Sequence, residues 1–203
     1  FSLRTQQSRP IYEGLVAIRD GAEWARLDGA QRRCIELKIR GAEHAGVGLT
    51  GKAKDRFNAI AAELSQLATD FSNHVLDATK AFELVVEDKA DTAGWPNSLR
   101  QVAAQSYEQA NECREATPEE GPWRITLDFP IFYPFMQHHR VRDHREQVYR
   151  ANAQKASTGE LDNSELIART LRLRKEQAGL LGFADYAEWS LDAKMAPDAS
   201  AVA

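Results

Sequence analysis

The histidines have the widest chemical range of the side chains in this sequence, yet none of them begins a catalytic pattern. A zinc peptidase places two imidazoles one helical turn apart, with a glutamate between them to activate water, as H-E-x-x-H. The sequence contains no such pattern, and it also lacks the G-x-S-x-G, G-x-x-x-x-G-K-[ST] and strand-following G-x-G-x-x-G motifs. We therefore predict no catalytic residue in this chain. The histidines are His44, His74, His138, His139 and His144.

Three of these histidines gather among charged side chains, and the group suggests either a metal site or an anion-binding patch. On a helix, however, His139 and Asp143 lie one turn apart on one face, a spacing that favours a surface ion pair over a ligand set. No RNA-binding motif accompanies the arginines, and the formal net charge of -4 gives no general attraction for nucleic acid. We predict no metal or other cofactor and no nucleic-acid partner. The group comprises His138, His139, Arg140, Arg142, Asp143, His144 and Arg145.

An aromatic run bounded by Pro130 and interrupted by Pro134 is the candidate binding feature. The run contains Phe132, Tyr133 and Phe135, an irregular arrangement that a hydrophobic core does not require. Core packing is the first expectation for these aromatic side chains, and a cleft for short peptides or another ligand lined by these three is the alternative that the irregular run leaves open. Other large aromatic residues fall mostly on apolar faces and are expected in the core, namely Trp24, Trp95, Trp123, Trp189, Tyr107, Tyr149 and Tyr186.

The composition is that of a folded globular chain. It is 43% hydrophobic and 28% charged, which argues against disorder. No apolar run approaches the roughly 20 residues that cross a bilayer. Cys34 and Cys113 lie far apart without a C-x-x-C partner, which favours two buried thiols over a zinc ribbon or disulfide framework. The chain begins with Phe1, so a processed product and a piece of something longer are both open.

Residues 8–80 are predicted to form three helices. Pro10 opens an amphipathic helix that Gly21 ends. Asp28 is placed to cap the second helix, which stops before Gly46. In the third, large apolar residues recur every three or four positions and predict a long helix with one buried stripe. The stripe, with Leu64 expected in the core at its middle, comprises Phe57, Ile60, Leu64, Leu67, Phe71 and Val75.

In residues 81–130 the apolar period changes from helical to alternating at two places. Glu83 and Glu87 flank apolar positions and are expected to face water on a half-exposed strand. A second alternating run ends at Pro130, and a helix opening at Pro96 lies between the two runs. We predict a small two-stranded sheet. Its apolar residues are Phe82, Leu84 and Val86 in one strand and Trp123, Ile125, Leu127 and Phe129 in the other.

Residues 131–197 are predicted to be helical again, over 131–156, 163–179 and 186–195. Asp162 with Glu165, and Asp185 with Glu188, have the spacing of capping boxes, and Gly182 is a natural helix stop. The fold class is therefore mainly α, with a small two-stranded β element. We expect one helical domain over residues 1–203, made of the parts 8–80, 81–130 and 131–197.

The C-terminal third resembles the M3 family of thimet-type zinc oligopeptidases, in the stretch upstream of its zinc motif. The strings LDFPIFYPFMQHHRVRDHREQVYRANAQKAS and LDNSELIARTLRLRKEQAGLLGFADYAEWSLDAKMA carry the resemblance. They contain a proline-interrupted aromatic run, then L-x-L-R-x-E-x-A-x-L-L-G-[FY], then K-M-A. The earlier stretch RRCIELKIRGAEHAGVGLTGKAKDRFNAIAAELSQLATDFSNHVLDATKAFELVV is also similar to this family. The likeness extends from about Ser8 to Pro197.

The resemblance implies the helical half of an ellipsoidal protein with a deep channel for short peptides, whose other half carries zinc. Because the H-E-x-x-H motif is absent, no catalytic residue, metal ligand or zinc cofactor carries over to this chain, which is predicted to be inactive alone. Three functions follow. The chain is a wall of the peptide channel that works with a catalytic half, a truncated and inactive relative that serves as a subunit of a larger assembly, or a free adaptor that binds short peptides.

The resemblance also implies a contact with a partner, either the missing catalytic half or a larger protein assembly. Trp189, Leu191 and Met195 on the last predicted helix offer large apolar side chains for that contact. The alternative is that this helix folds back onto its own domain. Residues 1–12 contain Arg4 and Arg9 and no acid, which fits the tail of an organellar presequence, so cytoplasm and an organelle interior such as mitochondrion or plastid are both expected.

Overall fold

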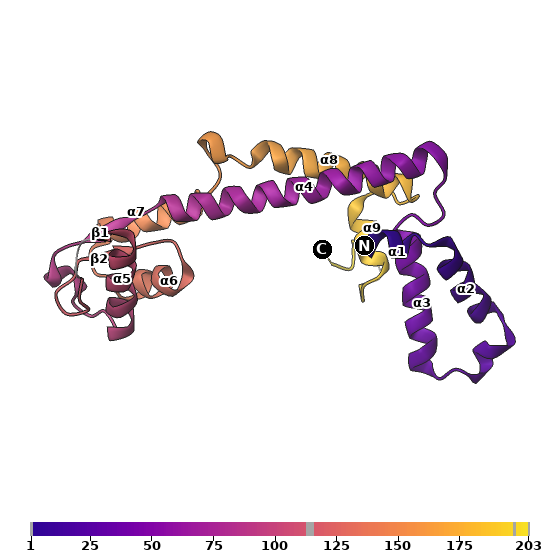
Figure 1. Ribbon diagram of the computed structural model, residues 1–203, viewed down its shortest axis with the longest axis horizontal. Coiled ribbons are helices and arrows are strands. Elements are labelled where there is room, and N and C mark those ends of the chain that lie inside the picture. Colours follow the sequence, from indigo (N-terminus) through magenta and orange to yellow (C-terminus); the bar gives the residue numbers. More distant parts are fainter. Residues whose placement is uncertain (1, 113–115, 197, 203) are drawn as a thin grey trace. The chain divides into compact units, whose positions relative to one another are not determined.

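The computed structural model describes residues 2–112, 116–196 and 198–202, and it is mainly helical (Figure 1). Its contacts divide the chain into two compact units. Unit 1 consists of Phe1–Leu67 with Ile167–Ala203, and unit 2 of Ala68–Leu166. The predicted fold class, mainly α with a small two-stranded β element, is confirmed. The assignment of one domain with parts 8–80, 81–130 and 131–197 stays a prediction.

Unit 1 begins with three helices and a short 3-10 segment. They are α1 (Ser2–Gln6), α2 (Arg9–Asp20), η1 (Ala22–Arg26) and α3 (Gly29–His44). Asp28 caps α3 as expected, because its Oδ1 accepts from the amide of Gln31 at 2.8 Å and the Gln31 side chain accepts from the amide of Asp28 at 3.0 Å. The reciprocal pair satisfies two amide donors at the start of α3.

The reversal between α3 and α4 (Gly51–Ala81) depends on Gly46. Its φ of 76° lies in the left-handed region, and a Cβ at this position would come within 2.9 Å of Leu49 Cδ1. The amide of Val47 donates back to the carbonyl of Ala42 at 3.0 Å, which closes the end of α3. Buried residues around this turn form the core of unit 1, namely Ile39, Ala42, Ala45, Val47, Phe57, Ile60, Leu173 and Ala178.

The long third helix predicted from the apolar stripe is confirmed as α4, but the stripe is only partly buried. Phe57 and Ile60 lie in the core, whereas Leu64 is half-buried and Phe71 is exposed. The expectation of Leu64 in the core was therefore wrong. In unit 1 the neighbouring helix α8 (Ser164–Leu180) contacts α4 through charged side chains beside Leu64 instead. Arg169 pairs with Glu63, and Arg56 pairs with Glu176.

The last two predicted helix caps are made differently from the capping boxes that their spacing suggested. Asp162 accepts from the amide of Ser164 at 2.8 Å, in front of α8. At α9 (Tyr186–Asp192) Asp185 accepts from the amide of Glu188 at 2.9 Å, but the Glu188 carboxylate accepts from the amide of Ala184. Gly182, with φ 91°, ends the stretch after α8 as predicted.

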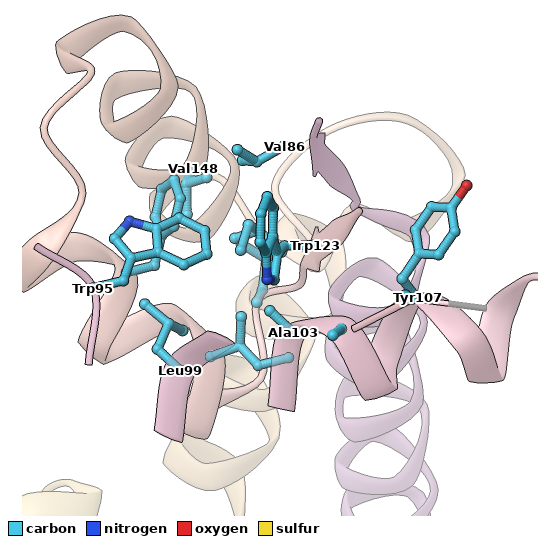
Figure 2. Close-up of a cluster of buried hydrophobic side chains, with 13 residues drawn as sticks. Val86, Trp95, Leu99, Ala103, Tyr107, Trp123 and Val148 are labelled. Atoms are coloured by element: carbon cyan, nitrogen blue, oxygen red, sulfur yellow. The ribbon is translucent and has the colours of Figure 1, made fainter. Parts of the chain in front are cut away.

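Unit 2 is built around the predicted sheet. Strand β1 (Leu84–Val86) pairs antiparallel with β2 (Trp123–Ile125), with Leu84 opposite Ile125 and Val86 opposite Trp123. Helix α5 (Asn97–Ala110), which follows η2 (Lys89–Thr92), packs on β2. Figure 2 shows Trp95 and Trp123 next to each other beside Leu99 and Ala103 of α5, and the two rings meet edge to face with centroids 6.2 Å apart.

The helix expected over 131–156 is divided in two. Helix α6 (Phe129–His138) ends at His139, and α7 (Arg142–Ala153) starts after Val141. His139 and Val141 both have extended backbone, with ψ values of 133° and 111°. The break turns the His139 ring into the core, where tertiary contacts override helix propensity. The segment η3 (Gly159–Leu161) leads from α7 to α8.

Two smaller expectations also need correction. Phe129 does not extend the second strand, because it begins α6 and is exposed. Cys34 is exposed on α3 rather than buried, and the buried residues of that helix are Ile39 and Ala42. Cys113 lies outside the described residues.

The uneven burial of α4 gives a stability prediction. Ile60→Ala should lower the free energy of unfolding by about 2–5 kcal/mol, because Ile60 is fully buried. Leu64→Ala should cost less, and the exposed Lys52→Ala should cost roughly 0.5 kcal/mol or less. Urea unfolding of the three variants measures this order. Equal losses at Ile60 and Leu64 would mean that the buried end of α4 is wrongly placed.

Candidate peptide-binding surface

Helix α6 has aromatic residues on two opposite sides. Phe135 is fully buried, and Ile131 one turn earlier is buried beside it. On the other side Phe129 and Tyr133 are 72% and 49% exposed. Their rings stack with centroids 5.4 Å apart and an interplanar angle of 14°. The exposed pair forms a flat aromatic surface, while the buried Phe135 and Ile131 fix the other side of α6 in the core.

Of the three residues predicted to line a cleft, the structure leaves only Tyr133 well exposed. Phe132 is half-buried and packs against the core of unit 2, and Phe135 lies inside that core. Phe129, which the periodicity assigned to a strand, joins Tyr133 instead. The i, i+4 spacing of Phe129 and Tyr133 was the signal for this pairing once a helix begins at Phe129.

His139 is the buried polar residue that fixes the end of α6. Its side chain is 1% exposed and stacks on Phe135 with ring centroids 4.3 Å apart. Trp95 Nε1 donates a hydrogen bond to His139 Nδ1 at 3.1 Å, and His139 Nε2 lies 3.0 Å from His144 Nδ1. The carbonyl of His139 accepts from the Arg145 guanidinium. Every polar atom of the imidazole therefore has a partner.

The indole N–H of Trp95 determines which ring nitrogen of His139 carries the proton. An indole N–H only donates, so His139 Nδ1 accepts, and the neutral ring carries its proton on Nε2. That proton is donated to His144 Nδ1. We call Trp95, His139 and His144 the imidazole relay. It connects the segment before α5, the end of α6 and the first turn of α7.

Burial lowers the pKa of His139 from 6.5 to about 4, and the neighbouring charge of His144 and Arg145 acts in the same direction. Asp91 on η2 opposes the shift only in part. His139 is therefore neutral at physiological pH, as the hydrogen bond from Trp95 requires. The expected surface ion pair between His139 and Asp143 is wrong, because the His139 ring is buried and Asp143 is exposed.

Helix α7 presents an open hollow of about 400 Å³ on its exposed side. We call it the arginine hollow. Residues of α7 spaced at one helical turn line it together with one residue of α6. Glu146 pairs with Arg150 at 2.7 Å, so one of the three cations is neutralised. The lining residues are Met136, Arg142, Arg145, Glu146, Tyr149 and Arg150.

The residues predicted to contact a partner lie in unit 1. Trp189 and Leu191 are half-buried on α9, while Met195 is fully exposed beyond the end of that helix. His44 of α3 meets Trp189 edge to face and lies 2.7 Å from the Asp192 carboxylate. These contacts attach α9 to α3. A role of the three residues in partner binding stays a prediction.

A zinc site needs at least three ligating side chains close together. In the ranges 2–112, 116–196 and 198–202, no three His, Cys, Asp or Glu side chains cluster as a metal site would require. His139 and His144 bind each other through the nitrogens that a metal would need. The residues that the structure describes therefore do not fit zinc. In the same ranges no helix is long and apolar enough to cross a membrane.

The chain matches two family descriptions. Residues 1–54 match the Neurolysin/Thimet oligopeptidase N-terminal domain, and residues 135–203 match Peptidase family M3. The chain therefore belongs to the M3 oligopeptidase family, as the motifs around LDFPIFYPFM and LLGF indicated.

Within that family it is homologous to the N-terminal part of oligopeptidase A. It is 44% identical over 196 residues, 97% of this chain, to organellar oligopeptidase A, chloroplastic/mitochondrial, of Arabidopsis thaliana. It is also 44% identical to the probable cytosolic oligopeptidase A of the same plant and 39% identical to oligopeptidase A of Haemophilus influenzae. The alignments cover 25%, 28% and 28% of these relatives, so the chain spans about a quarter of their length.

The lowered pKa of His139 predicts a pH-dependent stability. As pH falls from 6.5 toward 4, His139 becomes protonated in the unfolded chain but stays neutral in the folded chain. Proton uptake therefore favours the unfolded state, and the folded state loses stability. The loss at this residue should reach about 3 kcal/mol. His139→Phe should lower stability at pH 7, because Trp95 loses its acceptor, and should flatten this part of the pH profile.

Urea unfolding at several pH values between 7 and 4 measures the effect. The exposed neighbour gives a matched control, since His138→Phe should leave the profile unchanged. Parallel profiles for the His139→Phe variant and the unmodified chain would show that His139 is not held neutral in the folded state.

Proposed function

We propose that this chain is the non-catalytic helical portion of an M3-type zinc oligopeptidase and forms one wall of its peptide channel. The 44% identity to organellar oligopeptidase A across 97% of the chain carries this proposal. The zinc-binding sequence H-E-x-x-H is absent from the 203 residues, so the peptide-cleaving group comes from another segment. Cytoplasm or an organelle interior suits this role, because relatives of both kinds are equally similar.

The exposed aromatic pair on α6 is the surface that we assign to the peptide. Phe129 and Tyr133 stack on each other and leave their outer faces to solvent. Flat aromatic faces bind peptide backbone and apolar side chains without demanding one sequence. The buried partner Phe135 and the imidazole relay hold α6 in place, so the pair is carried on a rigid element.

A chimera tests the channel-wall function. The homologous segment of the Arabidopsis organellar oligopeptidase A is replaced by this chain, and cleavage of quenched oligopeptides is measured. We expect the chimera to cleave them. Tyr133→Ala should raise KM about threefold to tenfold with a smaller change in kcat, because binding area is removed away from the reacting bond. The exposed Phe71→Ala on α4 is the matched control and should leave KM unchanged.

A chimera that folds, as judged by circular dichroism, but cleaves no peptide would contradict the channel-wall proposal. That outcome would instead favour the alternative function, an inactive relative that serves as a subunit of a larger assembly. The unmodified enzyme with its own segment provides the reference activity.

We further propose that Met195 contacts the catalytic half, while Trp189 mainly stabilises unit 1. Met195 is fully exposed and apolar, whereas Trp189 is half-buried against His44. In the chimera Met195→Asp should lower activity without changing the urea midpoint of the isolated chain. Trp189→Ala should lower that midpoint. If Met195→Asp leaves chimera activity unchanged, the contact is not at this residue.

A further inference from the structure

We propose that the arginine hollow on α7 binds a carboxylate of an acidic peptide. The choice of a peptide as the ligand rests on the proposed function, while the binding of a carboxylate rests on the lining residues. The hollow of about 400 Å³ is in the range of small-ligand sites and has room for one or two peptide residues.

The charges in the hollow are unbalanced. Arg142, Arg145 and Arg150 face one acid, Glu146, which pairs with Arg150. Arg145 donates one N–H to the His139 carbonyl and has further guanidinium donors, since arginine carries five. Arg142 is exposed on the first turn of α7. The net positive charge left in the hollow attracts an anion.

Spacing favours a carboxylate between the first two arginines. Arg142 and Arg145 are three residues apart on α7, which brings their Cβ atoms to roughly 5–6 Å. One guanidinium group binds the two oxygens of a carboxylate in a bidentate manner, and the second arginine one turn away adds positive charge beside it. The positive N-terminal end of α7 acts in the same direction.

The other walls of the hollow favour a peptide over a bare anion. Tyr149 is 59% exposed and Met136 lies on the neighbouring helix α6. An aromatic ring and a thioether beside the arginines offer apolar contact for the backbone or side chains around the carboxylate. The formal net charge of the whole chain is -4, so an acidic peptide is attracted at this hollow against a repulsive background.

Direct binding to the 203-residue chain tests the proposal. Unlabelled peptides acetylated at the N-terminus are titrated by isothermal titration calorimetry at low ionic strength: a glutamate peptide amidated at its C-terminus, the glutamine peptide with a free C-terminus, and the glutamine peptide amidated. We expect one of the first two to bind and the third to fail. The glutamate peptide would identify a side-chain carboxylate, and the free glutamine peptide would identify the C-terminal one.

Arg142→Gln should weaken binding of that peptide roughly tenfold or more, because a charge-assisted hydrogen bond is lost. Arg172→Gln, which removes an exposed arginine on α8, is the matched control and should have no effect. Arg142→Lys keeps the charge and should recover only part of the affinity.

Equal binding of all three peptides, or no binding at all, would overturn the proposal. A short single-stranded RNA that binds more tightly than either peptide and depends on Arg142 would overturn it as well, in favour of a nucleic-acid surface. Cleavage by the chimera tests the channel-wall function separately. Failure of carboxylate binding at the arginine hollow would therefore leave the channel-wall proposal to be judged by the chimera alone.

Discussion

The imidazole of His139 is buried where α6 ends, and unit 2 is arranged so that both of its ring nitrogens keep a partner. An unpaired polar group in such a place costs about 1–3 kcal/mol. Trp95 supplies a donor on one side and His144 an acceptor on the other. The backbone bends at His139 and Val141 to allow this, and that bend separates α6 from α7.

Two exposed surfaces follow from the bend. Helix α6 buries Phe135 against the His139 ring, which leaves Phe129 and Tyr133 on its outer side. His144 is held by the relay at the first turn of α7, and the arginine hollow lies along that helix. Both surfaces belong to packed helices and not to loops, so their side chains start from fixed backbone positions.

Much of this fold could be predicted from local sequence signals. Pro10, Gly46 and Gly182 mark helix ends through backbone restrictions that act within a few residues, and the alternation around Leu84 and Trp123 marks the strands. The family was recognisable for a different reason, since the order of short motifs near the C-terminal third is specific to it.

What could not be predicted depends on contacts between distant residues. Val141 precedes α7 without a side-chain cap, so no local residue marks the break after His139. The partner of His139 is Trp95, 44 positions away, and only the folded core brings them together. The same limit explains why the burial of Leu64 was predicted wrongly. The helical period shows which side of a helix a side chain lies on, but not how completely a neighbouring element covers it.

Nitrogen chemical shifts of the histidine rings test the imidazole relay most directly. Near pH 6, long-range proton–nitrogen spectra of the chain should show His139 as the neutral ring protonated on Nε2, with an unprotonated Nδ1 that accepts from Trp95. This signal should remain that of a neutral ring as the pH falls below 6, because burial lowers the pKa of His139 to about 4. A His139 ring that is protonated on both nitrogens, or on Nδ1, would contradict the relay and the arrangement of α6 and α7 that depends on it.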